Sequence, residues 1–518
     1  MLKFYWFIRN NVKKSQFFYY SFNFVQLKSQ FILKKINFLL VACILFHSFS
    51  FAQTTCNLGF ADIYPCNNYD LMSNVPISTL ANTLGNPEGS DIWGWTDPLD
   101  GKEYAIMATT NSTAFVDISN PTSPVFLGRL DTQNGNTNYW RDVKVYNNYA
   151  FIVADNVGAH GMQVFDLTNL RTVSSPQTFT ADTVFNDVGS CHNIVINESM
   201  GYAYLVGCNT FSGGPVFVDI SNPLAPTGVG GYADKGYTHD AQVVTYNGPD
   251  TAYSGHEILI ASNGAFSGTD KVVILDVTDK SNPVFIAEAT YPNAGYAHQG
   301  WFTEDHRYFI MGDETDEQAF GMNSRTLVFD FLDLDNPILS STYNGSSAAI
   351  DHNGYVKDDL FFLANYRAGM RVMDLSNVGA ATNSLTEVGY FDTYPANNNT
   401  SFNGAWSIYP YFDSGNIIIS DIERGLFVVR KSGTLNTEDY DLESAFTITP
   451  NPTHSNPKVE STNGYVINSL KVTNTLGQCI LTKNNIQVTE FVIPLNNLQK
   501  GMYFVTLNNA VTKKLLYN

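Results

Sequence analysis

Short hydrophobic runs that end in aspartate recur along the chain. Such a run predicts a buried strand, and the short polar side chains that follow it cap their own backbone in a turn. The copies are TAFVDISNP (113–121), GMQVFDLTN (161–169), GPVFVDISNP (214–223), KVVILDVTD (271–279), RTLVFDFLD (325–333), GMRVMDLSN (369–377) and a degenerate GLFVVRKSG (425–433). We interpret the repeated aspartates as turn formers rather than ligands. They are Asp117, Asp166, Asp219, Asp276, Asp330 and Asp374.

Two further short strands precede each copy, and in most copies a fourth follows it. Examples are RDVKVYN and YAFIVAD before the second copy, and PVFLGRL after the first. Four short strands therefore recur at intervals of about 50 residues, a pattern typical of a β-propeller whose blades surround a central channel. The seven copies predict seven blades over residues 83–433.

The seventh repeat has no fourth strand of its own. The segment NVPISTLAN (74–82) begins like the fourth strands of other repeats. Because an unpaired edge strand invites aggregation, we expect residues 53–82 to supply the outer strand of the last blade, next to a small disulfide loop.

Residues 446–518 follow a polar, acidic stretch, TLNTEDYDLESA (434–445), which we interpret as a linker. Their alternating hydrophobic positions and tight turns predict a compact β-sandwich. The expected fold class is therefore all-β, with a seven-bladed β-propeller followed by a small β-sandwich. An aromatic content of 14% and a charged content of only 15% agree with a β-rich chain.

The N-terminal region 1–52 has the features of a secretory signal peptide. The apolar stretch INFLLVACILFHSFSF (36–51) follows two lysines, and small residues precede Gln53, where we expect cleavage. The alternative is a transmembrane anchor, for which the stretch is short. Residues 1–35 are long for the basic start of a signal peptide. The alternative is that the start codon is mis-assigned and lies after this segment.

Removing this region makes the remaining chain strongly acidic. The whole chain carries −19, and residues 1–52 hold seven Lys or Arg and no acidic residue, so the remainder carries −19 − 7 = −26. Such a charge argues against nucleic acid or anionic lipid as a partner. It is compatible with cations or neutral glycans.

Four cysteines form two local pairs, Cys56 with Cys66 and Cys191 with Cys208. In an exported chain, such pairs predict disulfides. The alternative for the second pair is two reduced, buried thiols. The sequence has no C-x-x-C motif and so gives no sign of a structural zinc site.

Histidine recurs at the start of the first strand in four consecutive blades, where the innermost strand meets one mouth of the channel. These residues are His192, His239, His298 and His352, and the aligned positions in the other blades are Ser90, Arg141 and Asn403. Imidazoles that converge in this way suit a divalent transition metal. Two alternatives are a structural role, in which each histidine links neighbouring blades, and contact with an organic ligand.

Loops on the same face add polar candidates for a ligand-binding surface. They are Asp155, His160, Asp313, Glu314, Asn365, Arg367, Asp421 and Arg424. Carboxylates and imidazoles at one mouth are consistent with a metal or polar-ligand pocket.

Two parts of the chain resemble known families. The C-terminal residues, with Pro450-Asn451-Pro452, Leu476-Gly477-Gln478 and the Gly501–Val505 run, resemble the sorting domain of type IX secretion cargo. This resemblance implies a Bacteroidetes-type bacterium, passage through the periplasm and outer membrane, and a final place on the cell surface or outside the cell. The stretches DIWGWTDP, AHGMQVFDL and NYRAGMRVMDLS resemble the choice-of-anchor B family of LVIVD-repeat propellers, for which the resemblance implies no chemistry.

These observations favour an exported binding or interaction module for a glycan, a peptide or a surface partner. The alternative is a metal-dependent hydrolase or lyase, with Asp313 and Glu314 as candidates for the general base. A third interpretation is a structural spacer without a ligand. The sequence has no G-x-S-x-G, H-E-x-x-H or P-loop motif, and it identifies no cofactor beyond a candidate divalent metal.

Overall fold

The computed structural model describes residues 53–82, 86–264, 270–433, 446–461, 466–475, 478–495, 498–508 and 511–518. The predicted signal peptide (1–52) and linker (434–445) lie outside these residues. Within the described ranges, no helix is long and apolar enough to cross a membrane.

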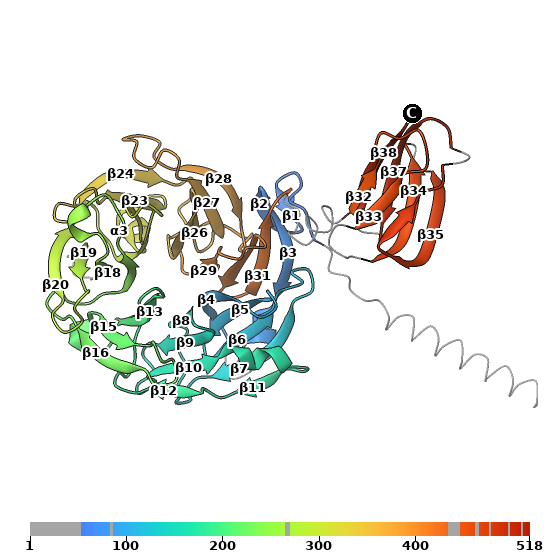
Figure 1. Cartoon of the computed structure of the whole chain (residues 1–518). Helices are drawn as coiled ribbons and strands as arrows, with labels where there is room; N and C mark the ends of the chain where they lie inside the picture. Colours follow the sequence, from blue (N-terminus) through green and yellow to red (C-terminus); the bar gives the residue numbers. More distant parts are fainter. Residues whose placement is uncertain are drawn as a thin grey trace, which may run out of the picture. The chain divides into compact units, whose positions relative to one another are not determined.

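Seven sheets, each built on four antiparallel strands, are arranged in a ring and confirm the predicted propeller (Figure 1). Blades 1 to 3 comprise β4 (Gly89–Thr96), β5 (Glu103–Thr109), β6 (Ser112–Asp117) and β7 (Val125–Asp131); β8 (Arg141–Tyr146), β9 (Tyr149–Ala154), β10 (Met162–Asp166) and β12 (Thr183–Phe185); and β13 (Asn193–Asn197), β14 (Tyr202–Val206), β15 (Val216–Asp219) and β16 (Thr227–Gly231). An additional strand, β11 (Gln177–Phe179), pairs in parallel with β7.

The next four blades repeat this order. They comprise β17 (Asp240–Thr245), β18 (Glu257–Asn263), β19 (Lys271–Asp276) and β20 (Val284–Ala289); β21 (Ala297–Phe302), β22 (Tyr308–Asp313), β23 (Arg325–Asp330) and β24 (Ile338–Asn344); β25 (Gly354–Lys357), β26 (Leu360–Ala364), β27 (Met370–Asp374) and β28 (Thr386–Phe391); and β29 (Ala405–Tyr409), β30 (Asn416–Asp421) and β31 (Gly425–Lys431). Short helices lie in connecting segments: α2 (Ile77–Leu80), η1 (Leu167–Thr172), η2 (Phe211–Gly213), η3 (Thr251–Tyr253) and α3 (Asp316–Phe320).

The repeated aspartates form turns, as predicted. In all six copies the carboxylate accepts a hydrogen bond from the backbone N–H two residues later, at 2.7–2.9 Å. Each bond satisfies a backbone donor where the third strand of a blade ends. The six carboxylates are thus committed to the outer turns rather than to the channel.

The hydrophobic core lies between neighbouring blades. Between blades 3 and 4, for example, Tyr204 and Phe217 pack in one cluster with Leu259 and Val273, and all four are at most 1% exposed. Each blade therefore buries both faces of its sheet, which fixes the angle at which its inner strand meets the channel.

The N-terminal segment closes the ring. Strand β3 (Tyr69–Val75) is the outer strand of blade 7 and pairs antiparallel with β31, from Tyr69 opposite Lys431 to Val75 opposite Leu426. This strand lies earlier than the predicted 74–82, because Pro76 ends it and α2 follows. Ahead of it, β1 (Phe60–Ala61) and β2 (Tyr64–Asn67) extend blade 6 through pairing of β2 with β28.

Both predicted disulfides are present. Cys56 is bonded to Cys66, and Cys191 is bonded to Cys208 across the start of blade 3. The first bond closes the N-terminal loop, and the second lies beside His192. Among the described residues, Cys479 is the one free cysteine, and it is exposed.

The C-terminal residues form two small sheets that share one core, as expected for a β-sandwich. One sheet comprises β32 (Phe446–Thr449), β33 (Lys458–Ser461) and β36 (Glu490–Val492), and the other comprises β35 (Cys479–Val488), β34 (Ile467–Asn474), β37 (Gly501–Leu507) and β38 (Val511–Tyr517). Val459 of the first sheet and Leu470, Val505 and Leu515 of the second lie in this core and are at most 1% exposed.

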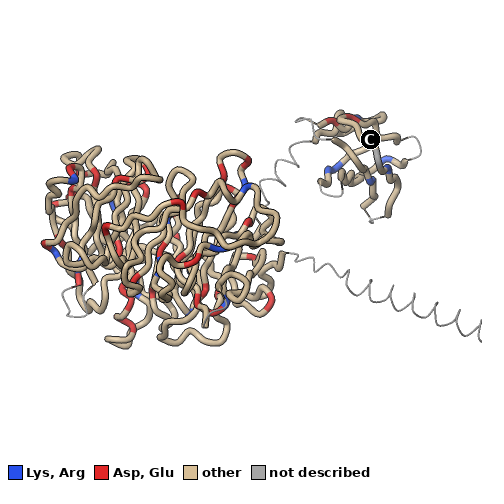
Figure 2. The backbone as a smooth tube through the Cα atoms, turned by 90° about the horizontal axis from the view of Figure 1, so that it is seen from below, with Lys and Arg blue, Asp and Glu red and all other residues tan. Residues whose placement is uncertain are grey.

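Acidic residues are spread along the backbone of the propeller rather than collected in one segment (Figure 2). The negative charge therefore acts on the whole domain and does not by itself mark a site.

Candidate functional site at the channel mouth

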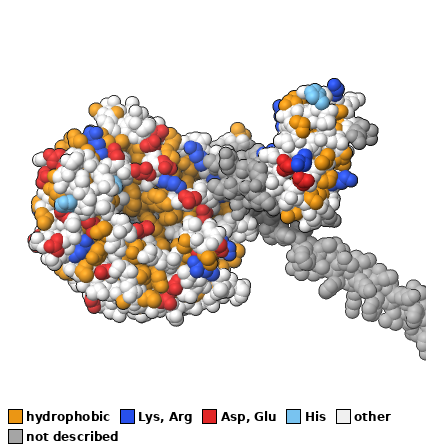
Figure 3. Space-filling model, viewed as in Figure 1, with side chains coloured by type: hydrophobic (Ala, Val, Ile, Leu, Met, Phe, Trp, Pro, Cys, Tyr) orange, Lys and Arg blue, Asp and Glu red, His pale blue; other side chains and the backbone are white. Residues whose placement is uncertain are grey.

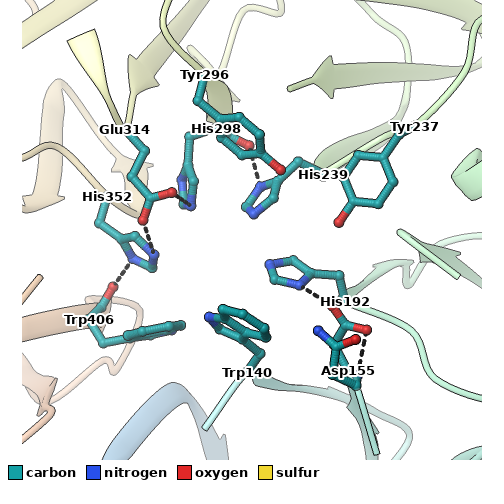
Figure 4. A pocket seen from close by; sticks show the side chains of 11 residues that line it. Trp140, Asp155, His192, Tyr237, His239, Tyr296, His298, Glu314, His352 and Trp406 are labelled. Atoms are coloured by element: carbon teal, nitrogen blue, oxygen red, sulfur yellow. Dashed lines mark hydrogen bonds and ion pairs between the residues drawn. The ribbon is translucent and has the colours of Figure 1, made fainter. Parts of the chain in front are cut away.

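The starts of the inner strands of blades 3 to 6 bring the four histidines to one mouth of the channel. His192 and His239 directly precede β13 and β17, His298 lies in β21, and His352 stands two residues before β25. They line a cavity of about 230 Å³, which we call the histidine cavity (Figure 4). Its lining consists of Trp140, Asp155, Asn156, His192, Tyr237, His239, Tyr296, His298, Glu314, His352 and Trp406.

The four imidazoles form a continuous arc. Ring centroids are 4.4 Å apart between His192 and His239, 4.3 Å between His239 and His298, and 4.3 Å between His298 and His352. The arc ends on Trp406, whose ring centroid is 4.6 Å from that of His352. Because each ring comes from a different blade, the arc exists only in the closed propeller.

Two of the histidines link neighbouring blades through their Nδ1 atoms. His239 donates to the carbonyl of His298 at 3.0 Å, and His352 donates to the carbonyl of Trp406 at 2.5 Å. A carbonyl only accepts, so Nδ1 carries the proton and, in the neutral ring, Nε2 has a free lone pair. The structural role considered for these residues therefore also prepares them as ligands.

His192 is oriented differently. Its Nδ1 lies 3.0 Å from Oδ2 of Asp155, a residue of the loop that follows β9. The pair forms the opposite end of the arc, where the ring of Trp140 lies 6.2 Å from that of His192. Asp155, predicted from a loop, and His192, predicted from the repeat position, are thus hydrogen-bonded to each other.

Glu314 faces the arc from the end of β22. Its Oε1 accepts a hydrogen bond from the hydroxyl of Tyr366 at 2.8 Å and lies 3.6 Å from Nε2 of His352. Its Oε2 lies 3.7 Å from Nε2 of His298. One donor atom from each of these three residues lies within 4.8 Å of the other two, which makes the cluster a candidate for holding a metal ion.

Burial sets the charge of this cluster. It lowers the pKa of His352 to about 3, and burial together with neighbouring imidazoles holds the pKa values of His239 and His298 well below the usual range. Burial also raises the pKa of Glu314 to about 7. At neutral pH these three rings are therefore uncharged, which is the form that binds metal.

A second cavity, of about 370 Å³, adjoins the first and shares Trp140, Glu314 and Trp406 with it. We call it the aromatic cavity. Its remaining lining consists of Glu88, Tyr139, Thr315, Gln318, Tyr366, Phe402 and Ile422. Among the described residues, no Lys or Arg lines either cavity. On the face seen in Figure 3, hydrophobic side chains gather around the central hollow of the ring.

Several of the predicted loop candidates lie outside both cavities. Asp313 is fully buried, and its carboxylate accepts hydrogen bonds from Tyr291 Oη and from the backbone N–H groups of residues 295, 296, 315 and 316 at 2.8–3.2 Å. These bonds hold the loop after β22 and do not favour Asp313 as a general base. Its neighbour Glu314 faces the cavity instead.

The other outlying candidates also make contacts within the protein. His160 is buried beside Arg141, and burial lowers its pKa to about 4. Asn365 donates to Asp351 at 3.0 Å, and Arg367 donates to Asn403 at 3.1 Å.

Asp421 and Arg424 belong to one turn. The Asp421 carboxylate accepts from the backbone N–H of Arg424 at 2.7 Å, and the guanidinium of Arg424 lies 4.7 Å from the ring centroid of Tyr394. Neither residue lines the cavities at the mouth.

The aromatic walls of the site were not among the predicted residues. In a chain with 29 Tyr and 36 Phe, single aromatic residues in loops give little signal. One signal was present, because Tyr237 and Tyr296 each stand two residues before a cavity histidine, in GYTHD and GYAHQ. The repeated Tyr-x-His pattern identifies both tyrosines as neighbours of the arc.

Comparison with known protein families identifies a repeat within the propeller and a sorting domain at the C-terminal end. The LVIVD repeat model matches residues 102–132, 139–166 and 189–234, and the secretion system C-terminal sorting domain model matches residues 447–517. No curated protein matches the chain.

Solved structures with a similar arrangement are distant in sequence. A β-propeller domain of Cps50 (Swd1) from Myceliophteria thermophila is 12% identical, covers 68% of this chain and 98% of its own, and has a TM-score of 0.44. A functionally unknown protein from Desulfotomaculum acetoxidans is 11% identical, with coverages of 60% and 87% and a TM-score of 0.44. A protein from Lactobacillus plantarum is 14% identical, with coverages of 71% and 99% and a TM-score of 0.41.

A sorting domain of this type implies interaction with the type IX secretion machinery and export to the cell surface or outside the cell. The chain therefore carries LVIVD repeats within a seven-bladed β-propeller and ends in a type IX secretion sorting domain.

Proposed function

We propose that the protein is an exported binding module whose channel mouth takes a positively charged organic group, such as the ammonium of a peptide side chain. The observation that carries this proposal is the aromatic cavity, where five aromatic residues and two glutamates line about 370 Å³ and the described lining includes no Lys or Arg. The resemblance to choice-of-anchor B propellers and the predicted signal peptide fit a module presented outside the cell.

The lining of this cavity favours a cation over a neutral ligand. Aromatic faces attract a cation, by about 0.5–2 kcal/mol for each ring depending on how dry the site is. Glu88 adds a carboxylate whose pKa is raised by burial and by the nearby charge of Glu423. A bound cation would relieve this unfavourable burial of negative charge, whereas a neutral sugar would leave it in place.

Binding has more support than hydrolysis at this mouth. A hydrolase needs a general base within reach of the reacting water. Asp313 is occupied by its five hydrogen bonds, and Asp155 is paired with His192. The other cavity carboxylates are Glu88, which lines only the aromatic cavity, and Glu314, which lies 3.6–3.7 Å from His352 and His298.

Titration of the full chain with a charged peptide tests this proposal. The N-acetylated, C-amidated tripeptide Gly-Lys-Gly is added in the presence of a chelator, and binding is followed by tryptophan fluorescence and calorimetry. The Gly-Gln-Gly peptide is the neutral control. We expect saturable binding of the lysine peptide, weakened about fivefold by Trp140→Leu, since one cation–π contact contributes about 1 kcal/mol.

Glu88→Gln should weaken binding in the same direction. Glu198→Gln is the matched control, because Glu198 lines a different cavity, with Trp93 and Lys144, near the opposite ends of the inner strands. Equal binding of both peptides, or tighter binding of a neutral oligosaccharide, would overturn the proposal.

A further inference from the structure

We propose that His298, His352 and Glu314 bind one divalent transition metal ion, with zinc the best match to this set of two imidazoles and one carboxylate. The site lies in the histidine cavity and joins blade 5, which supplies His298 and Glu314, to blade 6, which supplies His352. It does not depend on the organic ligand proposed above, although both sites use Glu314.

The distances fit a metal better than they fit hydrogen bonds. Nε2 of His298 and Nε2 of His352 lie 3.7 Å and 3.6 Å from the two oxygens of Glu314, beyond hydrogen-bonding range. Around a tetrahedral zinc ion with bonds of about 2.0–2.1 Å, neighbouring donor atoms are about 3.3 Å apart. One donor atom from each residue lies within 4.8 Å of the other two, so the three donors must move closer by at most about 1.5 Å to bind one ion.

Proton positions give the second argument. His352 donates its Nδ1 proton to Trp406, so its Nε2 presents a lone pair toward the carboxylate of Glu314. With Glu314 in its ionised form, two acceptors face each other across 3.6 Å with no hydrogen between them. A cation placed between them satisfies both groups, and the carbonyl that fixes the tautomer is the usual outer partner of a metal-binding histidine.

Neighbouring side chains hold the proposed ligands Glu314 and His298 in position. Tyr366, 1% exposed, donates its hydroxyl to Oε1 of Glu314 at 2.8 Å and holds the carboxylate against the arc. His298 is 2% exposed, and its ring lies between the rings of His239 and His352. The ring of His298 is thus held by packing between two other histidines, with its Nε2 toward Glu314.

Direct metal titration tests the site. The full chain is stripped with a chelator, dialysed, and titrated with ZnCl₂ by calorimetry and with CoCl₂ by visible absorption, which reports the number and geometry of the ligands. We expect one ion per chain. His298→Gln combined with His352→Gln should weaken binding by at least about 100-fold, beyond the usual effect of an outer-sphere change.

Glu314→Gln is the second variant, because it keeps the bond from His352 to Trp406 and so leaves the blades linked. It should weaken binding about tenfold or more. His256→Gln is the matched control, since His256 pairs with Asp276 on the outside of blade 4 and should leave binding unchanged. Circular dichroism confirms that each variant is folded.

The proposal is overturned if the stripped chain binds no zinc, or if the folded Glu314→Gln variant binds zinc as the parent does. Because the peptide titration is run in chelator and the metal titration without peptide, failure of one proposal is distinguishable from failure of the other.

Discussion

Replacing Lys144 by methionine should destabilise the propeller strongly and in a pH-dependent way. Lys144 is 7% exposed, and its Nζ lies 3.0 Å from Asp91 of blade 1 and 2.5 Å from Asp142 of its own blade. Asp142 in turn accepts from the backbone N–H of Ile194 in blade 3, at 2.7 Å. Methionine keeps the volume but leaves buried carboxylates without their cation, which costs about 3–5 kcal/mol.

The sign of the pH dependence follows from Asp91. Burial raises its pKa to about 8 even though Lys144 opposes the shift. A carboxyl whose folded pKa lies above its unfolded value of about 4 favours the folded state at low pH and disfavours it as pH rises toward 8. Without Lys144 the shift is larger, so the free energy of unfolding of the variant should fall more steeply between pH 5 and pH 8.

Urea denaturation at pH 5 and pH 8 measures both effects. Lys102→Met is the control, because Lys102 forms an exposed pair with Asp100 and should change the stability by no more than about 0.5 kcal/mol. Adding Asp91→Asn to Lys144→Met should restore part of the loss. A loss below about 1 kcal/mol at both pH values would refute the assigned role of this buried pair.

Three further predictions concern other parts of the molecule. Replacing Cys191 and Cys208 together by serine should lower the free energy of unfolding by about 3 kcal/mol, because the disulfide closes a loop of 17 residues in the unfolded chain. Urea denaturation of variant and parent, under oxidising and reducing conditions, measures this loss. Deleting residues 53–75 removes β3, the outer partner of β31, so size-exclusion chromatography should show aggregation through the exposed edge; a monodisperse, folded product would contradict this. Tyr366→Phe should weaken zinc binding about tenfold while the fold stays that of the parent by circular dichroism, and an unchanged zinc affinity would argue against the support of Glu314 by this hydroxyl.

The blades were predictable from the sequence because each one repeats the same local chemistry. A run of aliphatic residues, an aspartate and a backbone donor two residues later are consecutive in the chain, so the pattern of the turn is visible without knowledge of the fold. The same holds for the disulfides, whose partners are local. The closing strand was placed several residues too late because a Pro-aliphatic pattern resembled other fourth strands, and pairing with β31 depends on contacts across the whole domain.

The site was predictable only in part. The histidines share a repeat position, so their convergence followed from the propeller itself. Asp313 and Glu314 are adjacent, and neighbouring residues at the end of a strand point to opposite sides. Which of them faces the channel depends on where β22 ends, so the sequence did not separate the buried turn former from the residue at the mouth. The aromatic walls come from several blades, and apart from the Tyr-x-His pattern of Tyr237 and Tyr296 they share no such repeat position.

The ring of blades closes only when the chain contains both β3 and β31, because these two strands pair with each other. The two strands come from opposite ends of the domain, and Asp70 accepts a hydrogen bond from Ser432 across the seam. A chain that ends before β31 cannot form these contacts, and it presents two open sheet edges to proteases and to other unfinished chains. Because residues 446–518 follow the seam in the chain, synthesis from the N-terminus reaches the sorting domain only after every strand of the ring. In the order of synthesis, the domain that directs export therefore follows a complete set of propeller strands.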